Sequence, residues 1–312
     1  MINQKIIFLF ILFFLVACNG NYSGNERDFK NSLNFQAKSF VAVGDAGSII
    51  TSDDGLLWDS ITSGTINFLN GVSFVDNTLV VVGNEGTILK SWNNSSWSPF
   101  YHGNVNIFKS VTFGHGFYMF TQDPGGLMFT EVWDDWPEIF SVKSYNDIAF
   151  DETSSYFLAV GEAGAICKIE DMENCSEKNS GTSRDLKGVN FSNDKYIAVG
   201  NSGTIIASSD GGNTWNIKTS GTSQDLLDIF YKNNSYVVVG SSGVILTSSD
   251  GDTWSSKNSG TTKDLYGITY GKNKFVAVGM EGTILTSTDT ESWIKRSSGI
   301  IVSINDVTYK NN

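Results

Sequence analysis

YIAVGNSGTIIASSDGGNTWNIKTSGT, residues 196–222, is the stretch that decides the fold of this chain. It returns as YVVVGSSGVILTSSDGDTWSSKNSGT at 236–261 and as FVAVGMEGTILTSTDTESWIKRSSG at 275–299. Weaker copies begin at Phe40, Leu79, Phe117 and Phe157. The residues that close the apolar run of each copy lie 38 to 40 positions apart: Gly44, Gly83, Thr121, Gly161, Gly200, Gly240 and Gly279. Seven copies at a nearly fixed period predict a repeat architecture.

Each copy contains four short extended pieces, which in the fifth copy are 186–191, 196–199, 204–208 and 215–219. The second piece is apolar at every position, so both of its faces are expected to be buried. Gly-rich turns separate the pieces. Four antiparallel strands per copy, with one strand buried on both faces, predict an all-β fold, a seven-bladed β-propeller of four-stranded blades.

The ring is predicted to close by joining the two ends of the chain. An eighth copy of the innermost strand, 304–309, follows the last blade, and its place is in the blade made by 40–63. The N-terminal stretch 32–35 competes for the same position. Closure would leave no exposed sheet edge inside the ring.

Residues 1–17 have the pattern of a lipoprotein signal peptide. Lys5 precedes the apolar run 6–16, which is too short to span a bilayer as a helix. Leu15-Val16-Ala17-Cys18 resembles a bacterial lipobox, which implies cleavage before Cys18 and lipidation of that cysteine. The alternative is an ordinary signal peptide followed by an incidental cysteine. Polar residues 18–31 are predicted to be a tether, and 32–312 the propeller.

A motif called the Asp-box recurs in the third turn of the repeat. It is complete in Ser208-x-Asp210-x-Gly212-x-Thr214-Trp215. Decayed versions contain Asp53 with Trp58, Asp250 with Trp254, and Asp289 with Trp293. The Asp and Ser side chains are expected to accept hydrogen bonds from the turn, and the Trp to cover it. A structural role is favoured over sugar or metal binding.

The whole unit, VAVGxxGTILTSxDGxxW followed by Ser-Gly-Thr, resembles the repeat of the photosystem II stability/assembly factor family, which is related to bacterial neuraminidase (BNR) repeats. The resemblance covers about 32–309 and is weakest in the third blade. It implies a seven-bladed propeller that binds proteins and is not an enzyme. That family is expected to present an arginine-rich patch, whereas this chain has only Arg27, Arg184 and Arg296.

Composition excludes several classes of function. The net charge is −12, and −13 once Lys5 is removed, which disfavours nucleic acid and anionic membrane surfaces as partners. A sialidase needs three arginines converging from different blades, and Arg27 lies in the tether. Only two histidines are present, and no Gly-x-Ser-x-Gly elbow occurs. We therefore predict no catalytic residues, no metal site and no cofactor.

Cys167 and Cys175 are predicted to form a disulfide. Aligned with the fifth copy, they stand on facing strands of one hairpin, in a blade that lacks the Asp-box and its Trp. An exported compartment permits the bond. The alternative is two buried free thiols.

One face of the disc is predicted to be acidic. The turns between second and third strands carry Asp45, Glu85, Asp123, Glu162 and Glu281. The connections to the next blade add Asp185, Asp225 and Asp264, and the inner strands add Asp147, Asp228 and Asp306. Such a ring would attract a basic protein segment or hold a divalent cation weakly. Alternatively, these acids only cap backbone groups.

Three functional hypotheses follow. The first is a lipid-anchored propeller in the bacterial cell envelope, at the outer membrane or cell surface, that binds a protein partner, with a basic protein as one option. The others are a cell-surface glycan-binding module and a hydrolase.

Overall fold

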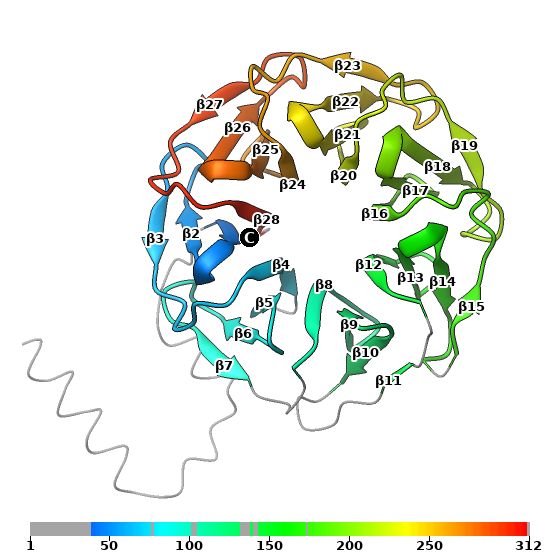
Figure 1. Cartoon of the computed structure of the whole chain (residues 1–312), viewed down its shortest axis with the longest axis horizontal. Helices are drawn as coiled ribbons and strands as arrows, with labels where there is room; N and C mark the ends of the chain where they lie inside the picture. The colour runs from blue at the N-terminus through cyan, green and yellow to red at the C-terminus, as the bar shows by residue number, and fades with distance from the viewer. Residues whose placement is uncertain are drawn as a thin grey trace, which may run out of the picture. The chain divides into compact units, whose positions relative to one another are not determined.

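The computed structural model describes residues 39–310 except 76–77, 101–104, 132–137, 140–142 and 173. The described chain forms seven four-stranded antiparallel sheets arranged as blades around one axis (Figure 1). The predicted seven-bladed β-propeller is therefore confirmed. The signal peptide, Cys18 and the tether lie outside the described residues, as does the competing stretch 32–35.

In every blade the innermost strand comes first and the others follow outward. Blade 1 is β28 (Ile304–Tyr309), β1 (Phe40–Gly44), β2 (Ile49–Ser52) and β3 (Asp59–Ile61). Blade 2 is β4 (Leu69–Val75), β5 (Thr78–Gly83), β6 (Ile88–Ser91) and β7 (Ser98–Phe100). Blade 3 is β8 (Ile107–Gly114), β9 (Phe117–Asp123), β10 (Leu127–Thr130) and β11 (Glu138–Ile139). Blade 4 is β12 (Tyr145–Asp151), β13 (Tyr156–Gly161), β14 (Ile166–Ile169) and β15 (Ser176–Glu177).

Blades 5 to 7 follow the same order. Blade 5 is β16 (Leu186–Ser192), β17 (Lys195–Gly200), β18 (Thr204–Ser208) and β19 (Asn216–Lys218). Blade 6 is β20 (Leu226–Lys232), β21 (Ser235–Gly240), β22 (Ile245–Ser248) and β23 (Ser255–Lys257). Blade 7 is β24 (Leu265–Gly271), β25 (Lys274–Gly279), β26 (Thr283–Ser287) and β27 (Ile294–Arg296). Five 3-10 turns join second to third strands: η1 (Asp45–Gly47), η2 (Glu162–Gly164), η3 (Asn201–Gly203), η4 (Ser241–Gly243) and η5 (Met280–Gly282).

The core consists of apolar layers between neighbouring blades. Val238 of β21, for example, packs with Ile197 of β17, whereas Val237 of the same strand packs with Ile268 of β24. Both faces of the second strand are therefore buried, as its continuous apolar sequence predicts. Because successive side chains of a strand point to opposite faces, one strand serves two layers.

Ring closure follows the sequence prediction. β28 pairs with β1 in blade 1, and Phe40 lies opposite Tyr309. Ile304 and Val307 of β28 are buried in a layer with residues of blade 7. The last strand of the chain therefore completes the first blade, and the sheet has no free inner edge.

In six of the seven blades a glycine closes the second strand, and it is required there because the backbone of another strand comes close, not because of its φ. Every innermost strand has a register shift, such as the one between Leu186 and Gly188. The shift brings a carbonyl oxygen against the closing glycine, so that a Cβ on Gly200 would overlap the oxygen of Asp185. The backbone of Gly200 is extended, with φ −171°.

The structure corrects the sequence alignment in blade 3. Phe108 pairs with Gln122 as Leu69 pairs with Gly83, and Thr121 lies one position earlier, opposite Ser110. Gln122, and not Thr121, therefore occupies the closing position. The register shift defines this position, which no glycine marks in the sequence of blade 3.

Blade 4 contains a disulfide between Cys167 on β14 and Cys175 just before β15, with their Cα atoms 5.3 Å apart. It joins the outer two strands where the hairpins of blades 1, 5, 6 and 7 have an Asp-box. We expect the double variant Cys167→Ala/Cys175→Ala to be about 2–3 kcal/mol less stable, because the closed loop restricts the unfolded chain. Chemical unfolding with and without reductant measures this difference.

Reductant should destabilise the native protein by a similar amount and leave the double variant unchanged. Two alkylatable thiols at these positions in the unreduced, folded protein would contradict the expectation.

Candidate binding face

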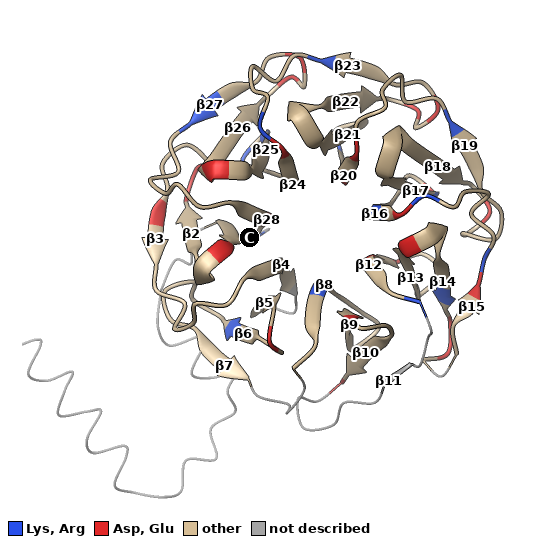
Figure 2. Cartoon of the chain, in the orientation of Figure 1, with Lys and Arg blue, Asp and Glu red and all other residues tan. Residues whose placement is uncertain are grey.

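We call the side of the disc that carries the second-to-third turns and the connections between blades the turn face. Backbone hydrogen bonds tie each connection to the turn of the blade that it enters, as Asp45 N–H donates to the oxygen of Ser303. The acids predicted in the turns lie on this face, in η1, η2 and η5, in the β5–β6 turn, and at the end of β9. Figure 2 shows acidic residues in the coiled turns of blades 1, 4 and 7.

The three aspartates of the connections hold neighbouring blades together. The carboxylate of Asp185 accepts a hydrogen bond from Ala163 N–H in the turn of blade 4, at 2.9 Å, and its carbonyl oxygen accepts one from Asn201 in blade 5. Asp225 and Asp264 repeat this arrangement between the following blades. The Ala163 N–H lowers the pKa of Asp185, because it stabilises the charged carboxylate. These residues therefore have a positioning role on the turn face.

Lysines neutralise part of the predicted acidic ring. Lys109 lies 3.1 Å from Asp123 and 3.8 Å from Glu162. Lys263 pairs with Glu281 at 2.6 Å. In blades 1 and 2, by contrast, Asp45 accepts a hydrogen bond from the amide of Asn305, and Glu85 is exposed. The ring is therefore not evenly acidic, which the spacing of acids in the sequence could not show.

Around the ring axis, Asp306, Asp147 and Asp228 connect innermost strands. Each carboxylate accepts a hydrogen bond from a backbone N–H of its own strand or from a neighbouring hydroxyl group. Each also accepts one from a backbone N–H of the next blade: Val72 donates to Asp306, Val189 to Asp147, and Ile268 to Asp228. Blades 2, 5 and 7 have glycine at the equivalent position, namely Gly71, Gly188 and Gly267. Blade 3 has Ser110, whose hydroxyl donates to Asp147 at 2.7 Å.

The pKa values of these three aspartates are raised. Burial raises the pKa of Asp306 to about 7, although hydrogen bonds from Val72 and Val307 oppose the shift. Burial, followed by the charges of Asp306 and Asp147, raises the pKa of Asp228 well above its usual range. The pKa of Asp147 is also raised by burial. The inner strands are thus joined by carboxyl groups whose ionisation is costly.

The Asp-boxes are built as structural clamps. Asp210 accepts hydrogen bonds from the N–H groups of Asn213 and Thr214 and from the Thr214 hydroxyl. Led by the Thr214 contacts, these bonds lower the pKa of Asp210 to about 2. The indole of Trp215 donates to the oxygen of Gly212 at 3.0 Å. Asp250 and Asp289 accept N–H groups of their turns, and Trp58, Trp254 and Trp293 pack on the blade layers.

In blade 1 the clamp uses Asp54 instead of the predicted Asp53. Asp54 accepts the N–H groups of Leu56 and Leu57, and Gly55 N–H donates to Ser52. Asp53 is exposed. Asp53 and Asp54 both fit the decayed motif, in registers one residue apart. Only the register with Asp54, which has the shorter spacing to Gly55, places the carboxylate inside the turn.

Blade 2 contains a further clamp that the sequence analysis missed. Asn93 accepts hydrogen bonds from the N–H groups of Ser95 and Ser96, as aspartate does in the other blades. The hydroxyl oxygen of Ser91 accepts a hydrogen bond from Asn94 N–H. An Asx-turn search that allowed asparagine would have found it.

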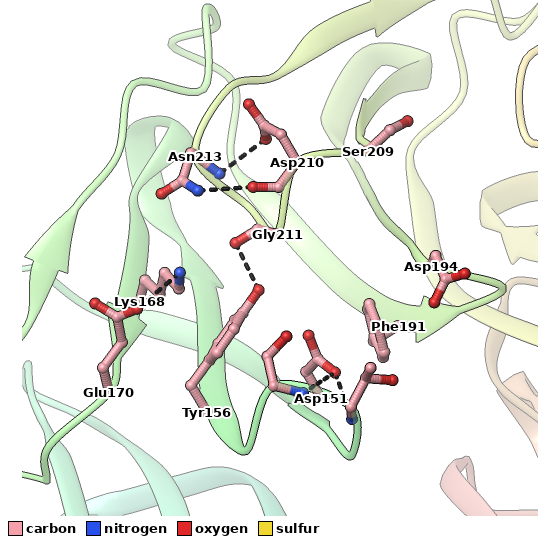
Figure 3. A pocket seen from close by; sticks show the side chains of 12 residues that line it. Asp151, Tyr156, Lys168, Glu170, Phe191, Asp194, Ser209, Asp210, Gly211 and Asn213 are labelled. Atoms are coloured by element: carbon pink, nitrogen blue, oxygen red, sulfur yellow. Dashed lines mark hydrogen bonds and ion pairs between the residues drawn. The ribbon is translucent and has the colours of Figure 1, made fainter.

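A cavity of about 510 Å³ opens between blades 4 and 5 on the side of the Asp-boxes (Figure 3). Tyr156 OH donates to the oxygen of Gly211 at 2.7 Å across it. Lys168 pairs with Glu170 at 2.9 Å and lies over the Tyr156 ring. Asp151 accepts two N–H groups of its own turn. Because these groups are satisfied within the protein, the cavity is better explained by blade packing than by a ligand.

Five apolar side chains on the turn face were also missed. Ile66, Val105 and Ile301 are 87%, 73% and 88% exposed, and Phe68 and Ile107 are partly exposed. The signal was available in the repeat, because the positions equivalent to Ile66 in the later connections are polar: Ser183, Ser223 and Thr262.

Within the described ranges, no helix is long and apolar enough to cross a membrane. No group of three or more His, Cys, Asp or Glu side chains in that same part of the chain is arranged to hold a metal ion.

Comparison with known proteins identifies solved structures that share this fold. No family model and no curated protein matches this sequence. Among solved structures, YCF48 bound to D1 peptide matches with a TM-score of 0.65 at 20% identity, over 81% of this chain and 93% of that one. YCF48 from Cyanidioschyzon merolae matches with a TM-score of 0.59 at 15% identity, over 73% and 84%. The computationally designed Ika8 protein gives 0.62 at 13% identity, over 90% and 93%. The chain therefore shares the propeller fold of YCF48, a photosystem II assembly factor.

Proposed function

We propose that this protein is a non-catalytic scaffold of the bacterial cell envelope, anchored by a lipid on Cys18, that binds a protein partner through its turn face. The observation that carries the proposal is the composition of this face, where exposed apolar side chains lie beside acids. Exposed apolar groups gathered on one face are typical of protein interaction sites. The solved complex of YCF48 with a D1 peptide supports a propeller of this fold as a peptide binder.

Site-specific photocrosslinking in intact cells tests the proposed function. A benzophenone amino acid is placed at Ile66 or Ser223 on the turn face, and at Leu57 in an Asp-box turn as a matched exposed control. We expect one defined protein adduct from a turn-face position and none from Leu57. Adducts from Leu57 alone, or from no position, would reject the scaffold function. Glycan binding on an array without any protein adduct would favour the glycan-binding alternative.

The anchor has a separate test. In Cys18→Ser the protein should move from the membrane fraction to the soluble fraction and lose the mass of the attached lipid. An unchanged membrane association would reject lipid anchoring without affecting the binding face.

A further inference from the structure

The turn face is divided into two chemically different halves. In each innermost strand one residue pairs with the closing position of the second strand, as Leu69 pairs with Gly83 and Phe108 with Gln122. The residue three positions before it is apolar where the chain enters blades 1, 2 and 3, and polar where it enters blades 5, 6 and 7. The residue directly before it changes in parallel, from Ser303, Phe68 and Ile107 to the aspartates at 264, 225 and 185. Because the fold is the same in all these blades, packing within the repeat does not require the apolar residues.

The apolar residues lie on three consecutive connections. We call this set the apolar crescent; its members are Ile301, Ile66, Phe68, Val105 and Ile107. Each connection packs on the turn of the blade that it leaves, since a Cβ on Gly282 would overlap the oxygen of Ile300 and one on Gly47 that of Thr65. Gly86 N–H in the turn of blade 2 likewise donates to the oxygen of Asn106, in the connection that leaves that blade. Connections are also tied to the turn of the blade that they enter, where Asp45 N–H donates to the oxygen of Ser303 and Asn84 N–H to that of Phe68. The crescent is therefore continuous along one side of the ring.

Acids alternate with the apolar side chains along this crescent. Asp45 lies in η1 between the connections that contain Ile301 and Ile66. Glu85 lies in the following turn, between the connections that contain Phe68 and Val105. The order around the ring is thus apolar, acidic, apolar, acidic, apolar.

A shallow, open cavity lies beside Ile66 of the crescent, at blade 1. It has a volume of about 560 Å³, and its wall includes Ile61, Ser63, Thr65 and Ile66 together with Ala46 of η1. This volume lies in the range of small ligand sites and is ample for one large apolar side chain. An exposed isoleucine on the wall of a cavity favours an apolar contact there.

We propose that the apolar crescent binds an extended segment of the partner protein in which apolar residues alternate with lysine or arginine. This inference rests on the proposed scaffold function and names the chemistry of its partner. Apolar side chains of the segment contact Ile301, Ile66 and Val105, and the largest enters the cavity at blade 1. Its basic residues face Asp45 and Glu85, which fits the charge order along the crescent.

The test uses full-length protein and a fluorescent eleven-residue peptide in which leucine and lysine alternate. Binding is followed by anisotropy. The triple variant Ile66→Ser/Val105→Ser/Ile301→Ser gives the crescent the side chains of the later repeats, and about tenfold weaker binding or more is expected. The matched control Leu57→Ser/Ile217→Ser/Ile294→Ser removes three apolar side chains that lie elsewhere and are 79%, 65% and 53% exposed. It should bind as the native protein does. Thermal unfolding should be the same for both variants.

The charge component is tested with Asp45→Asn/Glu85→Gln. This variant should bind the peptide more weakly at low salt and lose part of the salt dependence of binding. A peptide with glutamate in place of lysine should bind at least tenfold more weakly than the lysine peptide.

Three results would overturn the inference: equal weakening by both triple variants, equal binding of the glutamate peptide, or no binding to the native protein. A native dimer that the crescent variant dissociates in sedimentation would also overturn it, because the crescent would then contact a second copy. Failure here is distinct from failure of the scaffold function. A photocrosslinked adduct from Ser223 but not from Ile66 would keep the scaffold and reject the crescent.

Discussion

Truncation after Ile301 is expected to unfold the whole propeller cooperatively. The deletion removes β28, and with it the buried side chains of Ile304 and Val307 and the innermost strand of blade 1. It also removes Asn305, whose side-chain amide donates hydrogen bonds to Asp45 and to the carbonyl oxygen of Leu69 in blade 2. Burial of two such side chains and a paired edge contributes about 5 kcal/mol or more, which is comparable to the stability of a typical domain.

Thermal unfolding measured by circular dichroism checks this expectation. Truncation after Lys310 is the matched control, because it keeps β28 and should leave the melting temperature unchanged. A melting temperature unaffected by the longer deletion would mean that blade 1 does not depend on β28.

Stability is expected to fall by about 2 kcal/mol as the pH rises from about 4 to about 7, through the aspartates of the ring axis. The pKa of Asp306 rises to about 7 in the folded protein from 3.8 in the unfolded chain. In this window the folded state therefore binds more protons than the unfolded state, so that raising the pH favours unfolding. The residue keeps some exposure to solvent, which reduces the effect below the full linkage value.

Urea unfolding across this pH range should show a flatter profile for Asp306→Asn than for the native protein. Asp210→Asn is the control of opposite sign. The pKa of Asp210 is lowered to about 2, so its contribution is present above pH 3.8 and is lost as the pH falls toward 2. Its removal should lower stability evenly between pH 4 and 7. The same slope in the native protein and in Asp306→Asn would refute the role of Asp306.

The sequence predicted the features that recur in every copy and missed those that depend on where a side chain points. Seven copies and an extra inner strand were enough for the blades and for ring closure. The sequence also predicted acids in the turns. It did not predict that the carboxylate of Asp185 accepts a hydrogen bond from Ala163 in blade 4 while its carbonyl oxygen accepts one from blade 5. Side-chain direction in a connection depends on its backbone path, which the repeat period does not contain.

The errors occurred where a copy lacks its marker residue. Without the closing glycine, blade 3 was aligned on Thr121, and a decayed motif in blade 1 fitted Asp53 as well as Asp54. The apolar crescent was missed for another reason. Exposed isoleucine and valine in a connection look like core residues until the blade geometry shows that the core positions are already filled.

Ring closure also sets the order of events during synthesis. The partner of Phe40 is Tyr309, so the first blade cannot form until nearly the whole chain has emerged. Contacts between residues so distant in sequence form slowly, because a long loop must close first. A nascent propeller of this design stays open while it is being made. For a chain that we propose is exported, this delay keeps it in the unfolded form that a secretion channel accepts, and the last strand completes the domain after transport.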